Sequence, residues 1–262
     1  MEASIEYERV IFNMSENSLI NKAKYKKGLC YRHLNRYEDA LGELNRVNLF
    51  NIADTMRTKV LYEKAFNLML NENFQEALMN IRRINEEQLN KSTYNNILPL
   101  KILILNHTRN WEKAQKNFNQ WIESLSYTQI EKENWKDSVT KFYAEDNLPK
   151  NYSKEKARNL SRFIPGAGHL YAGHTLEGIG NFMLNGATAG LGIHQIWHGF
   201  YFTGYIAGLG VFYKSYFGGM ERAAYLANKE KEKEMANFNS TCSRFIKKVL
   251  HYQSSSLSPK KK

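Results

Sequence analysis

Cysteine and proline are scarce in this chain, and glycine is concentrated in one region. Only two of the 262 residues are cysteine, Cys30 and Cys242, which excludes a disulfide framework and a cysteine-rich zinc site. Charged residues make up 24% and hydrophobic residues 42% of the chain, a balance that excludes an intrinsically disordered protein. The 16 glycines would be ordinary if they were evenly spread, but 14 of them lie between Gly166 and Gly219.

Charge is also distributed unevenly. Residues 1–146 carry 21 Lys and Arg against 20 Asp and Glu, whereas residues 147–262 carry 16 against 6, so net charges of +1 and +10 make up the total of +11. Yet the 51 residues from 163 to 213 contain no Lys or Arg, and their one acidic residue is Glu177. Two regions of different physical character therefore meet near residue 150.

A short pattern recurs in the first region. Three alanines, Ala40, Ala77 and Ala114, are spaced by 37 residues, and each has an aromatic residue three positions before it and an apolar residue four positions after it. The aromatic residues are Tyr37, Phe74 and Trp111, and the apolar residues are Leu44, Ile81 and Phe118. These spacings are helical, and they predict pairs of helices joined by short polar turns.

The positions Gly28, Tyr31, Tyr37, Ala40 and Leu44 match the pattern of the tetratricopeptide repeat, which this region resembles over about residues 17–125. The period of 37 differs from the usual ~34, and the closing proline of the repeat is missing. The resemblance implies an all-α helical solenoid, because one helix pair cannot bury its apolar face alone. We expect units near residues 17–53, 54–90 and 91–127, a partial unit at 1–16 and a capping helix to 146.

The chain opens inside a repeat, because Ala3 aligns with Ala40 and Val10 with Val47. The second helix of a unit therefore comes first, and its own first helix is absent. We expect that an upstream segment, such as an export signal, preceded it.

The resemblance also implies a concave groove lined by the first helix of each unit, where a protein or peptide partner binds. The expected partner-binding residues are Lys22, Tyr25, Arg32, Lys59, Tyr62, Met69, Asn96 and Asn106. Their mixture of basic, amide and aromatic side chains suits an acidic or polar extended peptide. The alternative is a solvated inner surface of which some residues contact the core.

The glycine-rich, nearly charge-free segment predicts two membrane spans, near residues 176–197 and 199–217. A hydrocarbon core of ~30 Å needs ~20 helical residues, and basic and aromatic residues gather at the ends of the segment, as they do at membrane interfaces. Asn181 and Asn185 weaken the hydropathy of the first span. The alternative is a helical hairpin buried inside a soluble protein.

Small residues in both predicted spans favour close packing of the two helices. The pairs Gly186/Gly190 and Gly204/Gly208 have the small-xxx-small spacing that lets membrane helices touch backbone to backbone. We expect these pairs to face each other across the hairpin.

The entry to this hairpin has a motif of its own. Pro165, Gly166, Gly168, Tyr171 and Gly173 form a Pro-Gly-x-Gly-x-x-Tyr-x-Gly signature that resembles the opening of small two-pass membrane domains of many bacterial proteins. The resemblance implies an architecture, a repeat array fused to a membrane hairpin, and no agreed activity. A nucleotide-binding loop is not favoured, because the third glycine is replaced and no apolar strand precedes the motif.

Titratable residues of the hairpin are candidates for a chemical role. Glu177 is paired by spacing with His174, and His194 with His198, but the two pairs are ~30 Å apart on a straight helix. That separation disfavours one metal site, and an acidic residue beside a membrane is a functional candidate by default. We predict no catalytic constellation, no metal site and no cofactor.

The tail, residues 225–262, is predicted to be a basic amphipathic helix that ends in disorder from Gln253 to Lys262. Arg244 to His251 could then lie on anionic lipid. Nucleic-acid binding is not favoured, because aromatic residues do not interleave with the charges.

The preferred interpretation is a non-enzymatic, membrane-anchored adaptor or scaffold, in an envelope or membrane-assembly complex of a bacterial inner membrane. The alternatives are a membrane enzyme or transporter accessory that uses the His and Glu residues, and a soluble basic repeat protein that binds nucleic acid. The side of the membrane stays open. Basic flanks favour a cytoplasmic array, whereas a removed export signal favours a periplasmic one.

Overall fold

A computed structural model describes residues 2–50 and 52–257, and every regular element within those ranges is a helix. The predicted all-α class is therefore confirmed. The chain divides into two compact units, one formed by Met1–Asn147 with Thr241–Lys262 and the other by Leu148–Ser240. The division falls within the last helix, α13 (Val211–Leu257), which contributes to both units.

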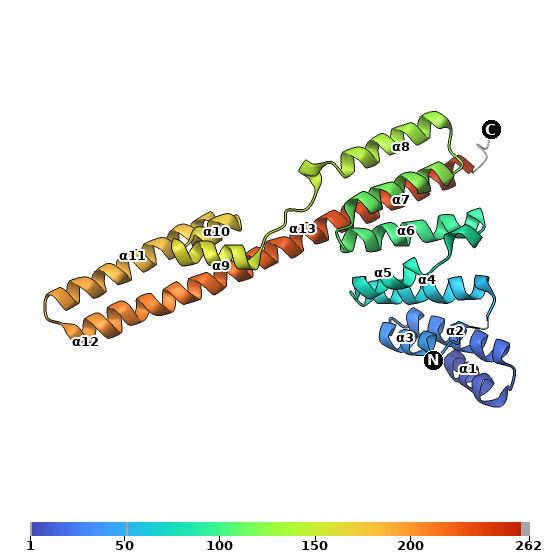
Figure 1. Ribbon diagram of the computed structural model, residues 1–262, viewed down its shortest axis with the longest axis horizontal. Helices are drawn as coiled ribbons and strands as arrows, with labels where there is room; N and C mark the ends of the chain where they lie inside the picture. The colour runs from blue at the N-terminus through green and yellow to red at the C-terminus, as the bar shows by residue number, and fades with distance from the viewer. Residues whose placement is uncertain (1, 51, 258–262) are drawn as a thin grey trace. The chain divides into compact units, whose positions relative to one another are not determined.

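The first unit is a series of antiparallel helix pairs (Figure 1). Its helices are α1 (Glu2–Asn13), α2 (Asn17–His33), α3 (Tyr37–Asn45), α4 (Asp54–Leu70), α5 (Phe74–Arg82), η1 (Glu86–Gln88), α6 (Lys91–His107), α7 (Trp111–Ser124), α8 (Gln129–Phe142) and η2 (Glu145–Asn147). The pairs α2/α3, α4/α5 and α6/α7 lie within the predicted units near 17–53, 54–90 and 91–127.

The residues that repeat at a spacing of 37 form the core of this unit. Ala40, Ala77 and Ala114 have no exposed surface. The apolar residues that follow them, Leu44, Ile81 and Phe118, are equally buried. A small side chain at the alanine position lets the two helices of a pair approach closely, and the larger residue one turn later fills the space beside it.

The turns between paired helices share an unusual backbone conformation. Asn35, Glu72 and Arg109, also spaced by 37, have φ angles of 57°, 59° and 57°, in the left-handed region. In each turn the amide of the following residue donates to a carbonyl five residues earlier, at 2.8 to 3.0 Å, which closes the end of the first helix. The structural repeat therefore extends to the turns, although only Asn35 is a residue that adopts this conformation readily.

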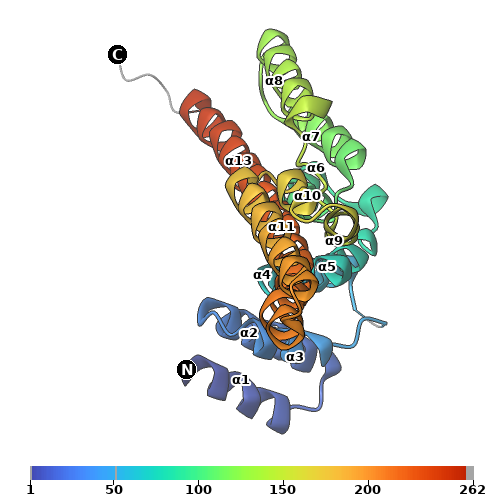
Figure 2. The same cartoon turned by 90° about the vertical axis from the view of Figure 1, so that its left-hand side faces the viewer.

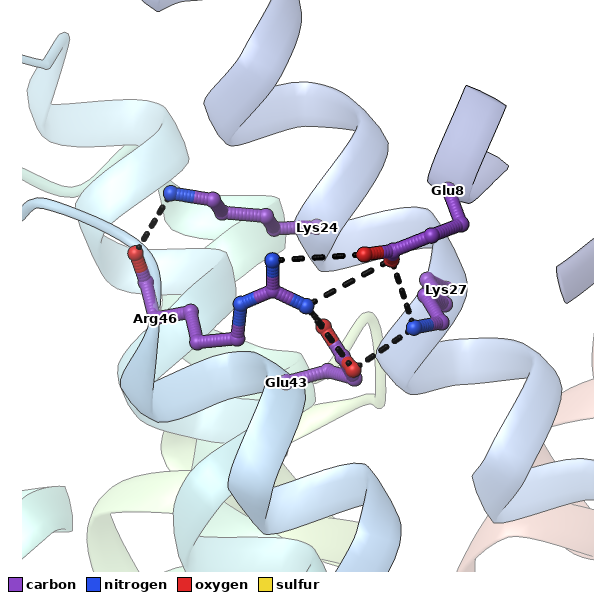
Figure 3. A network of polar contacts seen from close by, with 5 residues as sticks. All are labelled: Glu8, Lys24, Lys27, Glu43 and Arg46. Carbon is purple, nitrogen blue, oxygen red and sulfur yellow. Dashed lines mark hydrogen bonds and ion pairs between the residues drawn. The ribbon is translucent and has the colours of Figure 1, made fainter. Parts of the chain in front are cut away.

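A network of ion pairs joins the first three helices (Figure 3). The Lys27 ammonium on α2 donates to Glu8 on α1 at 2.7 Å and to Glu43 on α3 at 2.8 Å, and Arg46 pairs with the same two carboxylates. Burial alone would lower the pKa of Lys27, but its hydrogen bonds to Glu43 and Glu8 raise the pKa above the ordinary lysine value. The network therefore holds α1 to the first helix pair through charge.

The end of α13 completes the core of the first unit. The Phe245 ring lies 5.0 Å from that of Phe118 and 5.8 Å from that of Trp135, while Cys242 and Val249 are fully buried. Burial raises the pKa of the Cys242 thiol to about 12, so it stays protonated. The expectation that the apolar face of residues 244–251 lies on lipid is wrong, because protein side chains already cover that face.

Helix α13 extends to Leu257. The predicted disorder from Gln253 onward is therefore contradicted up to residue 257, and residues 258–262 lie outside the described residues.

The second unit is a helical hairpin with a short helical base. It contains α9 (Lys154–Phe163), α10 (Ala167–Tyr171), α11 (Thr175–Trp197), α12 (Tyr201–Thr203), the π-helix η3 (Gly204–Gly210) and the first part of α13. Figure 1 and Figure 2 both show α11 alongside the arm formed by α12, η3 and the start of α13. The predicted pair of helices near 176–197 and 199–217 is thus present as a hairpin.

The membrane-spanning character predicted for this hairpin is not supported by helix length and hydropathy. No helix in the described part of the chain is both long enough and apolar enough to qualify as a membrane span. Asn181, Asn185 and His194 lie within α11, and the second arm is divided among three helical elements.

The left-handed turn at Glu72 predicts a stabilising substitution. Glycine adopts a positive φ at little cost, whereas other L-residues pay ~1–2 kcal/mol there. We expect Glu72→Gly to raise the free energy of unfolding by ~0.5–1 kcal/mol, as measured by urea denaturation. The matched control is Glu112→Gly in the first turn of α7, which should lower it by ~1 kcal/mol, because glycine is unfavourable in a helix and the substitution removes a negative charge from the helix N-terminus. Equal destabilisation by both variants would contradict the assigned turn conformation.

Candidate functional site

A hollow of about 700 Å³ lies in the first unit between α2, α4 and the start of α6. Five of the residues predicted to bind a partner line it: Lys22, Tyr25, Lys59, Tyr62 and Asn96. The repeat brings them together because each comes from the first helix of a pair, and these helices lie side by side in the series. The hollow is called the groove below.

Three other predicted partner-binding residues do not line the groove. Arg32 is used in an ion pair with Glu63 at 3.0 Å, and Met69 lies half-buried outside the hollow. Asn106 is fully buried. Its side chain accepts a hydrogen bond from the Tyr143 hydroxyl at 3.0 Å and donates to the Cys242 sulfur at 3.0 Å. Asn106 is therefore a packing residue with no access to a ligand.

The floor of the groove combines aromatic rings with one carboxylate. Burial raises the pKa values of Tyr25 and Tyr62, so both hydroxyls stay protonated and available as donors. Glu63 is only 7% exposed, and burial raises its pKa while the nearby Arg32 opposes that effect. Sequence reasoning missed Glu63, because a glutamate in a helix ordinarily faces water.

The rim of the groove is positively charged. The exposed ammonium groups of Lys22, Lys26 and Lys59 have no carboxylate partner among the described residues. A second hollow of about 650 Å³ shares Lys59 with the groove and adds Arg57 and Arg83 to its lining. The acid of that second hollow, Asp54, is already paired with Arg57 at 3.2 Å. Uncompensated positive charge therefore surrounds an aromatic floor.

In the second unit, polar side chains lie between the two arms of the hairpin. The Ser215 hydroxyl donates to the Asn185 side chain at 2.8 Å, and Asn185 is only 1% exposed. One step nearer the base, the Asn181 side chain lies directly against Gly219. From the first contact to the second, the position shifts by four residues toward the N-terminus on one arm and by four toward the C-terminus on the other. This is the register of two antiparallel helices, and the line of contacts between the arms is called the seam below.

Glycines make the closest contact of this seam. A Cβ added at Gly208 would overlap the backbone of Gly192, and one added at Gly204 would lie 2.7 Å from Ile196. The predicted pair Gly204/Gly208 therefore does pack between the arms. The predicted pair Gly186/Gly190 does not, because both glycines face open space and Gly192 takes their place.

Large apolar side chains cover the outside of the hairpin. Those that are at least partly exposed include Leu176, Ile179, Phe182, Met183, Leu184, Leu191, Ile193, Trp197, Phe200, Tyr201, Phe202, Tyr205, Ile206, Val211, Tyr213 and Phe217. Large apolar side chains that are exposed together on one part of a protein often mark a surface that contacts another molecule or a membrane. The hairpin thus buries Asn185 between its arms and exposes many of its large apolar side chains.

The candidate titratable residues lie at opposite ends of α11. The Glu177 carboxylate receives two hydrogen bonds from the Arg222 guanidinium, at 3.0 and 3.2 Å, near the base. His194 and His198 lie at the tip with ring centroids 4.5 Å apart. The structure does not bring Glu177 and this pair together, and the described residues contain no group of three or more metal-binding side chains.

The glycine signature at the base has packing roles. Gly166 has a φ of 87°, and an added Cβ there would overlap the carbonyl of Gly178. A Cβ at Gly168 would overlap the carbonyl of Ala157. The Tyr171 hydroxyl accepts a hydrogen bond from the Ser153 amide at 3.1 Å. The motif therefore fastens α9 and α10 to the hairpin.

Comparisons with protein-family models, curated proteins and solved structures found no match to this chain.

The seam predicts opposite effects for two alanine substitutions. Gly208→Ala forces the arms apart and should destabilise the hairpin by ~1–3 kcal/mol, as overpacking does. The control Gly190→Ala adds the same methyl group to open space and should leave stability unchanged or raise it by up to ~1 kcal/mol. Thermal unfolding of the full chain followed by circular dichroism measures both. A larger loss for Gly190→Ala would contradict the assigned seam.

Proposed function

We propose that the protein is a non-enzymatic adaptor whose hairpin inserts into a lipid bilayer and whose groove binds an acidic segment of a partner protein. The observation that carries the membrane part is the polarity of the hairpin, with Asn185 inside and large apolar side chains outside. The groove, with its basic rim and aromatic floor, carries the partner part.

Insertion into lipid supplies the apolar surroundings that the outer surface of the hairpin lacks. Transfer of apolar surface out of water is favourable by ~25 cal/mol per Å². The mean hydropathy of a helix gives every residue equal weight, whether or not it is exposed. In α11 the polar Asn185 is buried between the arms, whereas the apolar Phe182 is exposed. The outer face is therefore more apolar than the average over the helix. The pairing of Asn185 with Ser215 also satisfies polar atoms that lipid could not.

The chemistry of the groove favours an acidic, extended ligand. Lys22, Lys26 and Lys59 offer charge that no carboxylate of the described residues neutralises. The aromatic floor, Tyr25 and Tyr62, offers area for side-chain packing and hydroxyl donors for backbone carbonyls. Because Glu63 is already held by Arg32, it does not cancel the positive rim.

An assembly role at a bacterial inner membrane is consistent with this arrangement. The resemblance of Pro165–Gly173 to bacterial two-pass membrane domains supports that location, and a tethered groove is suited to scaffolding a membrane complex. The enzyme alternative is less favoured, because Arg222 occupies Glu177 and the histidine pair lies at the opposite end of α11. Nucleic-acid binding is less favoured, because the tyrosines beside the basic rim, Tyr25 and Tyr62, are half-buried in the floor of the groove and offer little ring surface for base stacking.

The membrane proposal predicts that one charge on the outer face of the hairpin weakens lipid binding. Leu191→Asp places a carboxylate among exposed apolar residues of α11, and a charge in lipid costs ~2.5–3.5 kcal/mol. We expect co-flotation of the full chain with phosphatidylcholine vesicles to weaken about 100-fold.

The matched control is Ile130→Asp on α8, which is also an exposed apolar position but lies in the first unit. Its flotation should equal that of the parent. The proposal fails if the parent chain does not float with vesicles, or if both variants lose binding to the same extent.

The partner proposal predicts that reversal of one rim charge weakens binding of acidic peptides. Lys59→Glu should lower the affinity for a library of fluorescent acidic decapeptides about tenfold, equivalent to ~1.4 kcal/mol. Lys113→Glu, at an exposed site on α7 outside the groove, is the control and should bind as the parent does. Equal affinity for the same peptides with Asn and Gln in place of Asp and Glu would contradict recognition by charge.

A further inference from the structure

We propose that Arg162 and Lys214, on two sides of the hairpin base, each bind the phosphate headgroup of an anionic lipid. The proposal rests on insertion of the hairpin into lipid and adds the lipid class that is recognised. The two residues bound the charge-free segment in the sequence. Arg162 is the last basic residue before the segment without Lys or Arg, and Lys214 is the first after it.

The fold brings these two ends of the segment to the same level of the hairpin. The Tyr216 hydroxyl on α13 donates to the backbone carbonyl of Arg162 at 2.5 Å, which fixes the end of α9 against α13. Lys214 precedes Tyr216 by two residues and therefore lies ~3 Å away along the helix axis, on a different side of α13. The two cations thus flank the hairpin at the boundary of its charge-free part.

Both side chains are exposed, and neither has an ion-pair partner among the described residues. The cations one step further from the tip differ in this respect. Arg158 is paired with both carboxylate oxygens of Glu221 at 2.8 Å, and Arg222 is paired with Glu177. Arg162 and Lys214 thus differ from these neighbouring arginines in carrying positive charge that no carboxylate in the described part of the chain neutralises.

Exposed apolar residues adjoin each of the two cations. Phe163 and Ile164, which follow Arg162, are 83% and 57% exposed, and Tyr213, which precedes Lys214, is 64% exposed. A cation next to exposed aromatic and aliphatic side chains matches the junction between headgroups and acyl chains. A free phosphate ion would use the charges but would leave Phe163 and Ile164 in water. Anionic lipid satisfies both features.

The test compares binding of the full chain to two kinds of vesicle, phosphatidylcholine alone and an equimolar mixture with phosphatidylglycerol. A cation near an anionic surface contributes about fivefold in affinity, so the two together should favour the mixed vesicles about 30-fold. The double variant Arg162→Gln with Lys214→Gln should lose this preference and keep its binding to phosphatidylcholine. The preference of the parent should also decline as salt is raised.

Two controls isolate position and fold. Lys229→Gln with Lys231→Gln removes the same net charge from α13 beyond the site and should keep the preference. The exchange variant Arg162→Lys with Lys214→Arg retains both charges and should keep it as well. Circular dichroism melting of each variant establishes that the hairpin is folded.

The outcomes separate the two proposals. Equal binding of the parent to both vesicles, or an unchanged preference in the Gln double variant, overturns the headgroup site while insertion stands. Competition by inorganic phosphate at constant ionic strength would make the site one for free anions and would also overturn it. Failure of the parent to bind either vesicle overturns the membrane proposal itself.

Discussion

Close contact between small residues of antiparallel helices is the interaction on which both units depend. In the first unit Ala40, Ala77 and Ala114 allow each helix pair to close, so that the larger residues one turn away can fill the core. In the second unit Gly208 meets the backbone of Gly192 directly. Since dispersion forces decline steeply with distance, a modest separation of the helices would remove much of the packing energy at these positions.

The two units differ in which side chains they bury between their close-packed helices. The helix pairs of the first unit turn their apolar faces toward one another, and neighbouring pairs are in contact. The hairpin instead uses its seam for Asn185 and Ser215 and turns its apolar side chains outward. The same kind of helix packing therefore buries apolar side chains between the helices of one unit and leaves many of them exposed in the other.

Much of the first unit follows from the sequence because repeats encode local contacts. A spacing of 37 residues predicted the helix pairs and their close-packed alanines, and the resemblance to the tetratricopeptide repeat implied the five residues that line the groove. Asn106 was assigned to the groove from the resemblance to the tetratricopeptide repeat, in which the corresponding position faces a partner. In this chain Cys242, more than a hundred residues later, covers that position. No local pattern reveals such a contact.

The hairpin illustrates the same limit. Glycine content and the absence of charge predicted two packed arms, but the register between the arms depends on which residues oppose one another. On α11 the glycine that contacts the other arm is Gly192, and Gly186 and Gly190 do not contact it. Gly192 belongs to neither predicted small-xxx-small pair. The sequence likewise does not show which side of α11 faces the other arm. The structure buries Asn185 on that side and leaves Phe182 exposed on another.

The position of the last turns of α13 at the end of the chain sets the order in which the two units can complete their folding. Phe245 and Val249 complete the core around Phe118, yet they leave the ribosome only after the whole hairpin has been made. During translation the core around Phe118 therefore stays incomplete until residues 148–240 have been synthesised. The second unit is therefore synthesised in full before the core of the first unit can close.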